Sequence, residues 1–219
     1  MSAAREAVLG RVRSALADVT PTPEPVVPPI TSALSAAPEG HVLDVFVERV
    51  EDYKAVVEQV DAEGLAAHLA TLFEPGQRVV VPAGLPAELA AAVPVAVTED
   101  DGPLTAAELD AVDAVVTLAA VGVAETGTIV LDHSAGQGRR ALSLVPDRHV
   151  CVVRADQVVA DVPEAVARLA GAVSAGAPLT WISGPSATSD IELDRVEGVH
   201  GPRTLHVLLV AADTVGPVS

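Results

Sequence analysis

Aromatic residues and lysine are nearly missing from this 219-residue chain, and each shortage excludes a class of function. Phe, Trp and Tyr make up 2% of the residues, which leaves too few rings to stack on the bases of single-stranded nucleic acid. Lys54 is the single lysine and the formal net charge is −17, whereas non-specific binding to DNA, RNA or anionic lipid needs clustered Lys and Arg. We therefore expect no nucleic-acid partner.

Long apolar runs and cysteine are scarce as well. No uninterrupted apolar run approaches the ~20 residues that a membrane-spanning helix needs, so we expect no membrane insertion. The N-terminal segment MSAAREAVLGRVRSAL lacks the apolar core of a secretion signal. Cys151 is the single cysteine, so no disulfide framework forms within the chain and a cytoplasmic location is expected.

A proline-rich stretch divides the chain into two parts. Residues 2–17 place apolar side chains at the 3.6-residue spacing of a helix. The stretch from Thr20 to Pro38 is typical of an extended tether, because each proline lacks an amide donor and keeps its predecessor out of the helical region. We therefore expect an N-terminal helix at 1–18, a proline-rich tether at 19–40 and an α/β domain at 41–219.

The domain alternates short Val-rich or Leu-rich runs with helical segments. Apolar runs bounded by Gly, Pro and Asp are typical of strands buried on both faces, and the helices between them indicate a largely parallel sheet in a three-layer α/β/α fold. The predicted strands lie at 55–60, 78–82, 94–99, 113–118, 128–132, 150–155, 179–183 and 205–211. The predicted helices lie at 41–54, 61–73, 86–92, 105–110 and 162–173.

Three glycine-rich and polar segments follow predicted strands, where ligands bind in open α/β sheets. They are VGVAETGT (121–128), DHSAGQGRR (132–140) and SGPSATSDIE (183–192), the last followed by GVHGPR (198–203). Residues 41–123 hold 15 acids and 3 bases, a net of −12, whereas residues 124–206 hold 10 acids and 7 bases, a net of −3. A small anionic ligand is therefore expected in the second half.

The first polar segment has the glycine spacing of a phosphate-binding loop, from Gly122 to Gly127, but lacks its lysine. We do not expect nucleotide hydrolysis there. Two interpretations stay open. In one, Gly127 lets backbone amides approach a ligand while Glu125 presents a carboxylate beside it; in the other, the segment is a tight turn with a solvated Glu.

The second polar segment contains GQGRRA (136–141), a nominal dinucleotide fingerprint. The chain reaches Pro146 within about two turns, so no long helix is available to hold a pyrophosphate. A polar loop that delivers Arg139 or Arg140 to an anion is the better interpretation. For His133 and His149 we expect structural hydrogen bonds.

The third polar segment begins with a turn at Gly184-Pro185, after which Thr188 or Ser189 is predicted to cap a short helix. It lacks the second glycine of a serine-hydrolase elbow, so acyl transfer by Ser186 is not expected. Oxygen-rich metal sites use residue types such as those of Asp190, Glu192 and His200. No spacing signature accompanies them, and we expect no metal.

Four blocks together resemble the lactate utilization protein C family, a single-domain branch of the LUD proteins. They are AETGTIVL (124–131), RRALSLVPDRHVCVV (139–153), SGPSATSDIE (183–192) and GVHGPRTLHVLLV (198–210), and the resemblance spans roughly residues 41–212. It implies a fold similar to 5-formyltetrahydrofolate cyclo-ligase, ribose-5-phosphate isomerase and CoA transferases, in agreement with the predicted three layers.

The resemblance also implies a role in a three-protein system that oxidises L-lactate to pyruvate, with iron–sulfur proteins as partners. A cluster needs about four thiolates, so this chain, with Cys151 alone, is expected to be an accessory, non-redox subunit without a cofactor. The alternatives are a stand-alone enzyme of the CoA-transferase type with Glu125 as nucleophile, one of the cyclo-ligase type acting on a folate and a nucleotide, and a purely structural adaptor.

We place the candidate site in one cleft for a small anion. Arg140 is expected to pair with a carboxylate, and Asp190 and Glu192 to orient His200. The candidate catalytic residues are Glu125, Asp190, Glu192 and His200. The candidate ligand-binding residues are Thr126, Gly127, Thr128, Arg140, Ser183, Gly184, Ser186 and Thr188.

Overall fold

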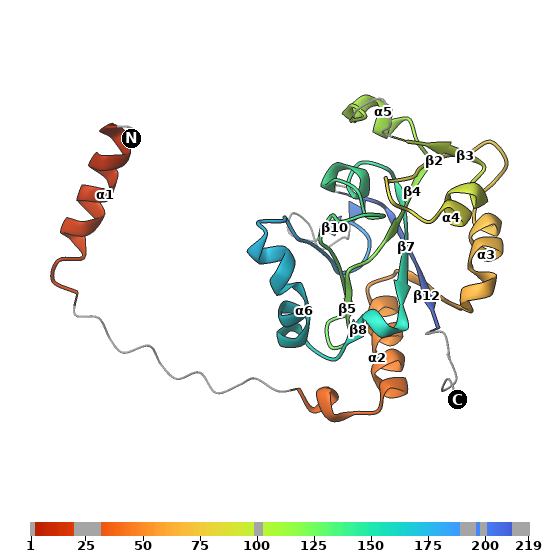
Figure 1. The fold of residues 1–219 in the computed structure, drawn as a ribbon, viewed down its shortest axis with the longest axis horizontal. Helices are drawn as coiled ribbons and strands as arrows, with labels where there is room; N and C mark the ends of the chain where they lie inside the picture. The colour runs from red at the N-terminus through yellow and green to blue at the C-terminus, as the bar shows by residue number, and fades with distance from the viewer. Residues whose placement is uncertain (1–2, 20–31, 99–102, 189–195, 198–200, 212–219) are drawn as a thin grey trace. The chain divides into compact units, whose positions relative to one another are not determined.

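The computed structural model in Figure 1 describes residues 3–19, 32–98, 103–188, 196–197 and 201–211. The chain divides into two compact units, Met1–Ile30 and Thr31–Ser219. The first unit contains helix α1 (Ala3–Ala15), in which no residue is buried. Its apolar side chains, among them Val8 and Val12, are exposed.

The second unit is built on a six-stranded sheet in which every pair of neighbours is parallel, as the sequence predicts. Val and Leu dominate the long strands, whose residues are buried from both sides. In sheet order the strands are β1 (Val56–Val60), β12 (Thr204–Val210), β7 (Arg148–Arg154), β4 (Ala114–Leu118), β2 (Arg78–Val80) and β3 (Val95–Val97).

Two hydrophobic cores lie on opposite faces of this sheet, because successive strand residues point to opposite sides. On β7, Val150 and Val152 pack with helices α3 (Leu65–Thr71) and α4 (Ala87–Ala92). Cys151 and Val153 pack instead with α2 (Glu39–Asp52) and with strands of a second sheet. Figure 1 shows this arrangement, with α3 and α4 on one side of the central sheet and α2 on the other.

The second sheet has the order β8 (Val158–Val159), β5 (Val121–Val123), β6 (Thr128–Leu131) and β9 (Thr180–Ile182). Helix α6 (Val162–Ser174) packs on it through Ala165 and Leu169. The predicted strands at 128–132 and 179–183 therefore exist, but they belong to this sheet and pair antiparallel with each other. Strand β8 has two residues, and β5 follows β4 almost directly and contains Gly122, so it looks like the start of a glycine-rich loop; a separate sheet was therefore not predicted.

The remaining elements are short. Helix α5 (Ala106–Asp110) begins with a capping box between Thr105 and Glu108. Strands β10 (Ala187–Thr188) and β11 (Val196–Glu197) form an antiparallel pair, so Thr188 lies in a strand and does not cap a helix as predicted; Ser189 lies outside the described residues. The described residues of the unit also contain four 3-10 turns: η1 (Ala33–Ala36), η2 (Ala62–Gly64), η3 (Arg140–Ser143) and η4 (Ala155–Gln157).

Residues just before α2 are bonded to the α/β unit through Asp161, the N-cap of α6. Asp161 accepts hydrogen bonds from the Glu164 amide (3.0 Å) and from the Ser32 amide (3.2 Å) and Ser35 hydroxyl (2.9 Å). These bonds hold the pKa of the Asp161 carboxyl below its usual value, with the Glu164 amide as the largest cause. Leu34 packs against the core on the α2 side of the sheet. The segment 32–37 is thus part of the folded unit.

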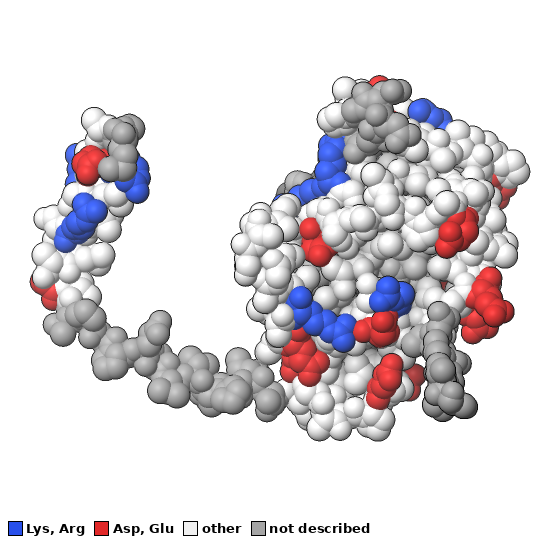
Figure 2. Space-filling model, in the orientation of Figure 1, with Lys and Arg blue, Asp and Glu red and all other residues white. Residues whose placement is uncertain are grey.

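On the face of the α/β unit shown in Figure 2, acidic side chains lie over α2 and near α3, and several basic side chains over the region of α2 lie directly beside acidic ones. In the part of the chain that the structure describes, no helix has both the length and the apolar character needed to cross a membrane.

Candidate anion-binding site

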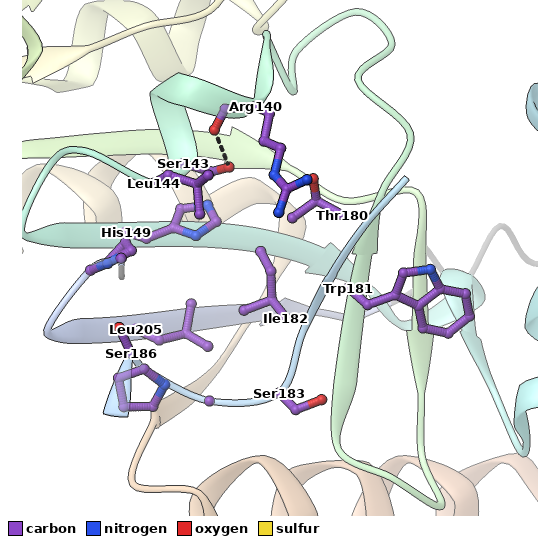
Figure 3. Close-up of a pocket in the computed structure, with 14 residues that line it drawn as sticks. Arg140, Ser143, Leu144, His149, Thr180, Trp181, Ile182, Ser183, Ser186 and Leu205 are labelled. Carbon is purple, nitrogen blue, oxygen red and sulfur yellow. Dashed lines mark hydrogen bonds between the residues drawn. The ribbon is translucent and has the colours of Figure 1, made fainter. Parts of the chain in front are cut away.

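A cavity of about 270 Å³ lies where the second sheet meets the central sheet (Figure 3). Its walls come from η3, from the first residues of β7 and β12, and from β9 with the turn that follows it. The lining residues are Arg140, Ser143, Leu144, His149, Thr180, Trp181, Ile182, Ser183, Gly184, Pro185, Ser186, Gly201, Pro202 and Leu205.

The antiparallel pairing of β6 with β9 decides which polar segments meet here. Ile182, at the end of β9, pairs with Ile129 near the start of β6, so Ser183 comes to lie beside Thr128. Their hydroxyl oxygens are 2.8 Å apart. The opposite end of β9 meets the end of β6, where the Thr180 hydroxyl lies 2.8 Å from Nε2 of His133. The two ends of β9 therefore each carry a polar contact, Thr180 with His133 at its start and Ser183 with Thr128 just after its end.

Alternation along β9 places Thr180 and Ile182 on one side of the strand and Trp181 on the other. The Thr180 side chain is buried, whereas the Trp181 indole is 40% exposed and points away from the other labelled side chains (Figure 3). Ile182 and Leu205 supply the apolar surface opposite the hydroxyl groups.

Arg140 supplies the positive charge of the cavity. Its side chain extends beside Thr180, and its backbone carbonyl accepts a hydrogen bond from the Ser143 hydroxyl at 3.2 Å (Figure 3). No Asp or Glu lines this cavity among the residues that the structure describes. A guanidinium in a site without carboxylates favours an anionic ligand.

His149 forms a neutral polar wall. Burial lowers its pKa to about 4, and its Nε2 lies 2.7 Å from the Thr117 hydroxyl. The same hydroxyl donates to the Cys151 sulfur at 3.6 Å, and burial raises the pKa of that thiol to about 12. Both His149 and Cys151 are therefore uncharged at neutral pH, and neither offsets the charge of Arg140. The expected structural hydrogen bonds of His133 and His149 are confirmed.

The turn between β5 and β6 is tied to the cavity through hydroxyl groups. Thr126 donates to Thr128 at 2.8 Å, and Thr128 in turn contacts Ser183. Gly127 has a φ of 58°, and a Cβ there would lie 2.6 Å from the Arg49 carbonyl carbon at the end of α2. The close approach of this turn to α2 therefore requires a glycine.

Glu125 faces a different hollow. A space of about 370 Å³ is lined by Arg49, Asp52, Tyr53, Glu125 and Thr126, and the Glu125 side chain is exposed. The Glu125 amide donates to the Ala160 carbonyl at 3.0 Å, which fixes the turn. The carboxylate and Arg140 therefore border two separate spaces, connected by the Thr126–Thr128–Ser183 hydroxyls.

The structure thus brings part of the predicted site together. Arg140, Ser183, Gly184 and Ser186 line one cavity, and Thr128 is bonded to it. The second hollow holds Glu125 and Thr126, while Gly127 lies against α2 and Thr188 lies in β10. Asp190, Glu192 and His200 lie outside the described residues.

Several cavity residues were not predicted as ligand-binding residues. His149 and Leu205 sit at the second position of long apolar strands, where periodicity indicates only a core role. Ser143 could have been predicted from the sequence, because it lies in the same 3-10 turn, η3, as the predicted residue Arg140. Within the described ranges, no three His, Cys, Asp or Glu side chains are grouped so that they could hold a metal ion.

Comparison with known proteins gives consistent matches. Residues 43–210 match the LUD domain family. Lactate utilization protein C of Deinococcus radiodurans is 52% identical over 189 residues, which are 86% of this chain and 87% of that protein. Lactate utilization protein C of Bacillus subtilis is 34% identical over 100 residues, 44% of this chain and 41% of that protein. The crystal structure of a DUF162 family protein from D. radiodurans, 45% identical, superposes with a TM-score of 0.70 and covers 80% of this chain and 99% of that one.

Proposed function

The chain belongs to the LUD domain family, and from this premise we propose that it acts in lactate utilization as a non-redox subunit that binds a small carboxylate. Cys151 is its single cysteine, and its thiol is buried. Oxidation of lactate to pyruvate releases electrons that this chain cannot pass to a cluster of its own, because a cluster takes about four thiolates. Iron–sulfur proteins are the proposed partners.

The observation that carries the proposal is Arg140 in a cavity that no described carboxylate borders. A guanidinium pairs with a carboxylate through two parallel hydrogen bonds, which are stronger than those between neutral groups. Ser143 and Ser183 border the same space: the Ser183 hydroxyl can donate to the hydroxyl or keto oxygen of the ligand, whereas the Ser143 hydroxyl, which donates to the Arg140 carbonyl, can accept from a ligand hydroxyl. The side chains of Ile182 and Leu205 provide an apolar surface that suits the methyl group of the proposed ligand.

The size of the cavity supports a three-carbon acid over larger substrates. Pockets for drug-sized ligands run from about 300 to 1,000 Å³, whereas this cavity has about 270 Å³. A folate together with a nucleotide does not fit in it. The size therefore argues against the cyclo-ligase alternative for this cavity and is sufficient for L-lactate or pyruvate.

The CoA-transferase alternative rests on a different observation, the exposed Glu125 carboxylate in the hollow beside Arg49. A nucleophilic carboxylate must be reachable by the acyl group of its substrate. Mass spectrometry of the chain after incubation with acyl-CoA tests this alternative, which requires a covalent adduct at Glu125.

Isothermal titration calorimetry with L-lactate and with pyruvate tests the proposed function. We expect one of them to bind the unmodified chain, and Arg140→Gln to weaken that binding about tenfold or more, because a hydrogen-bonded charge pair contributes roughly 1.5–3 kcal/mol. Arg168→Gln is the matched control, since Arg168 donates to the Asp156 carbonyl away from the cavity. Equal affinities in both variants, or no binding of either acid, would overturn the proposal.

A further inference from the structure

A second and larger cavity, of about 650 Å³, lies on the other side of Arg140. It is bordered by Ala83 and Gly84, which follow β2, and by the loop 133–140. We infer that this cavity binds the phosphoryl group of an organic phosphate. The cavity is a different space from the carboxylate cavity but shares Arg140 with it, so the inference is tested through Arg139 and Ser134, which border this cavity and not the other.

The position of the cavity is that of a ligand site in an open parallel sheet. The Gly136 amide donates to the Ala83 carbonyl at 2.8 Å, just beyond the end of β2. The Gly136 carbonyl accepts from the amide of Leu118, the last residue of β4, also at 2.8 Å. The loop therefore crosses the carboxyl ends of β2 and β4, where crevices in such sheets hold their ligands.

The charged residues that line this cavity are positive, whereas the chain as a whole has a net negative charge. Arg139 and Arg140 both border this cavity, and no Asp or Glu does so among the described residues, although the chain carries 30 acids against 13 bases. The Arg139 guanidinium donates to the Leu104 carbonyl, which holds it in place. Two arginines that border one space favour a doubly charged anion over an uncharged ligand.

Backbone donors are also available at this cavity. Gly84, Ala135 and Gly138 line it, and the amides of these three residues donate no hydrogen bond to another residue within the part of the chain that the structure describes. Backbone amides that lack a protein partner must be satisfied by water or by a ligand. Several such amides beside guanidinium groups are typical of phosphate sites.

The loop is preformed by its own contacts. His133 has a φ of 60°, which strains a residue other than glycine, and its ring nitrogens lie 2.7 Å from the Gly138 carbonyl and 2.8 Å from the Thr180 hydroxyl. Gly84 has a φ of 83°, and a Cβ there would lie 2.6 Å from that of Ala135. A ligand therefore meets an ordered loop, which reduces the entropy lost on binding.

These donors indicate a phosphoryl group and not a second carboxylate. A phosphoryl group offers three oxygens to the lining arginines and to the amides that lack a partner, whereas a carboxylate offers two. The volume leaves room for an organic part, and Leu142 and Pro178 provide apolar walls. No Phe, Tyr or Trp lines the cavity among the described residues, and the His133 ring is held by hydrogen bonds at both nitrogens, which favours an aliphatic phosphate monoester over a stacked nucleobase.

Calorimetry with glycerol 3-phosphate tests the inference, with glycerol as the ligand control. We expect glycerol 3-phosphate to bind and glycerol not to bind. Arg139→Gln is expected to weaken the binding about tenfold or more, and Arg168→Gln to leave it unchanged. Thermal unfolding of each variant shows whether it is folded.

The Ser134→Asp variant tests phosphate binding in this cavity without changing Arg139. The Ser134 side chain is exposed at the cavity and accepts from the Gln137 amide group at 2.9 Å, a bond that a carboxylate also accepts. Its added negative charge is expected to weaken phosphate binding about tenfold or more. Unchanged affinity in both folded variants, or absence of binding to the unmodified chain, overturns the inference. Lactate and pyruvate titrations of the same protein show separately whether the carboxylate proposal stands.

Discussion

The Thr117 hydroxyl lies 2.7 Å from Nε2 of His149, and both side chains are buried between the central sheet and the anion cavity. This bond satisfies one ring nitrogen of a histidine that stays neutral, since its pKa is about 4. The net positive charge of the cavity then depends on Arg140 alone among its described residues.

The depressed pKa of His149 predicts a loss of stability in acid. An unfolded histidine titrates near ~6.5, so below that pH the unfolded chain binds a proton that the folded chain, with a pKa of about 4, does not. The contribution of His149 is therefore complete above ~6.5 and declines as the pH falls toward 4, by roughly 3 kcal/mol in total. Urea unfolding at several pH values measures it. His149→Gln should show a shallower decline over this range, and an identical slope would contradict the prediction.

Two truncations test where the folded unit begins. Removal of residues 1–30 should leave the unfolding free energy of the α/β unit unchanged, because that segment forms its own compact unit. Removal of residues 1–38 deletes Ser32 and Ser35, which both bond to Asp161, and is expected to cost about 2 kcal/mol. Urea unfolding of the two shortened chains gives the comparison. Equal stabilities would show that the Asp161 contacts contribute nothing.

Two glycines with the same backbone conformation but different surroundings make a matched pair. Gly127 and Gly176 have φ values of 58° and 76°, and a Cβ at Gly127 would lie 2.6 Å from Arg49, whereas nothing lies within 4 Å at Gly176. Gly176→Ala should cost about 1 kcal/mol for the left-handed backbone, and Gly127→Ala at least about 2 kcal/mol more because α2 must move. Thermal unfolding measures the stability of the two variants, and similar unfolding midpoints would contradict the predicted difference between them.

The Glu125→Gln variant distinguishes a functional role of this carboxylate from a structural role. Its carboxylate is exposed, so Glu125→Gln should change the unfolding free energy by no more than about 0.5 kcal/mol. If Glu125 acts in lactate utilization, the same variant should fail to restore growth on lactate in a strain that lacks the native protein. Normal growth with this variant would remove Glu125 from the proposed catalytic residues.

The central sheet could be predicted from the sequence because its strands are Val-rich runs separated by helices. The second sheet could not, since β6 and β9 look like any other buried strand and their antiparallel partners are chosen by tertiary contacts. The pairing of Thr188 with Val196 likewise depends on a partner that local propensity does not specify.

The residues of the candidate site that lie in loops could be predicted from the sequence. Arg140, Ser183 and Ser186 come from polar segments that stand out against an apolar sequence. His149 could not be assigned to the cavity, because its position in an apolar run is equally typical of a core residue with a satisfied ring. The separation of Glu125 from Arg140 follows from the direction of β9, which no spacing in the sequence reveals.

Trp181 gives the protein an optical probe of its own. It is the single tryptophan of the chain, it lies between Thr180 and Ile182 on β9, and its indole is partly exposed to water. Selective excitation of tryptophan therefore reports on one strand, because no second tryptophan contributes to the fluorescence. Any ligand that shifts β9 or the turn after it will change the colour or intensity of that emission, so occupancy can be followed without attaching a dye.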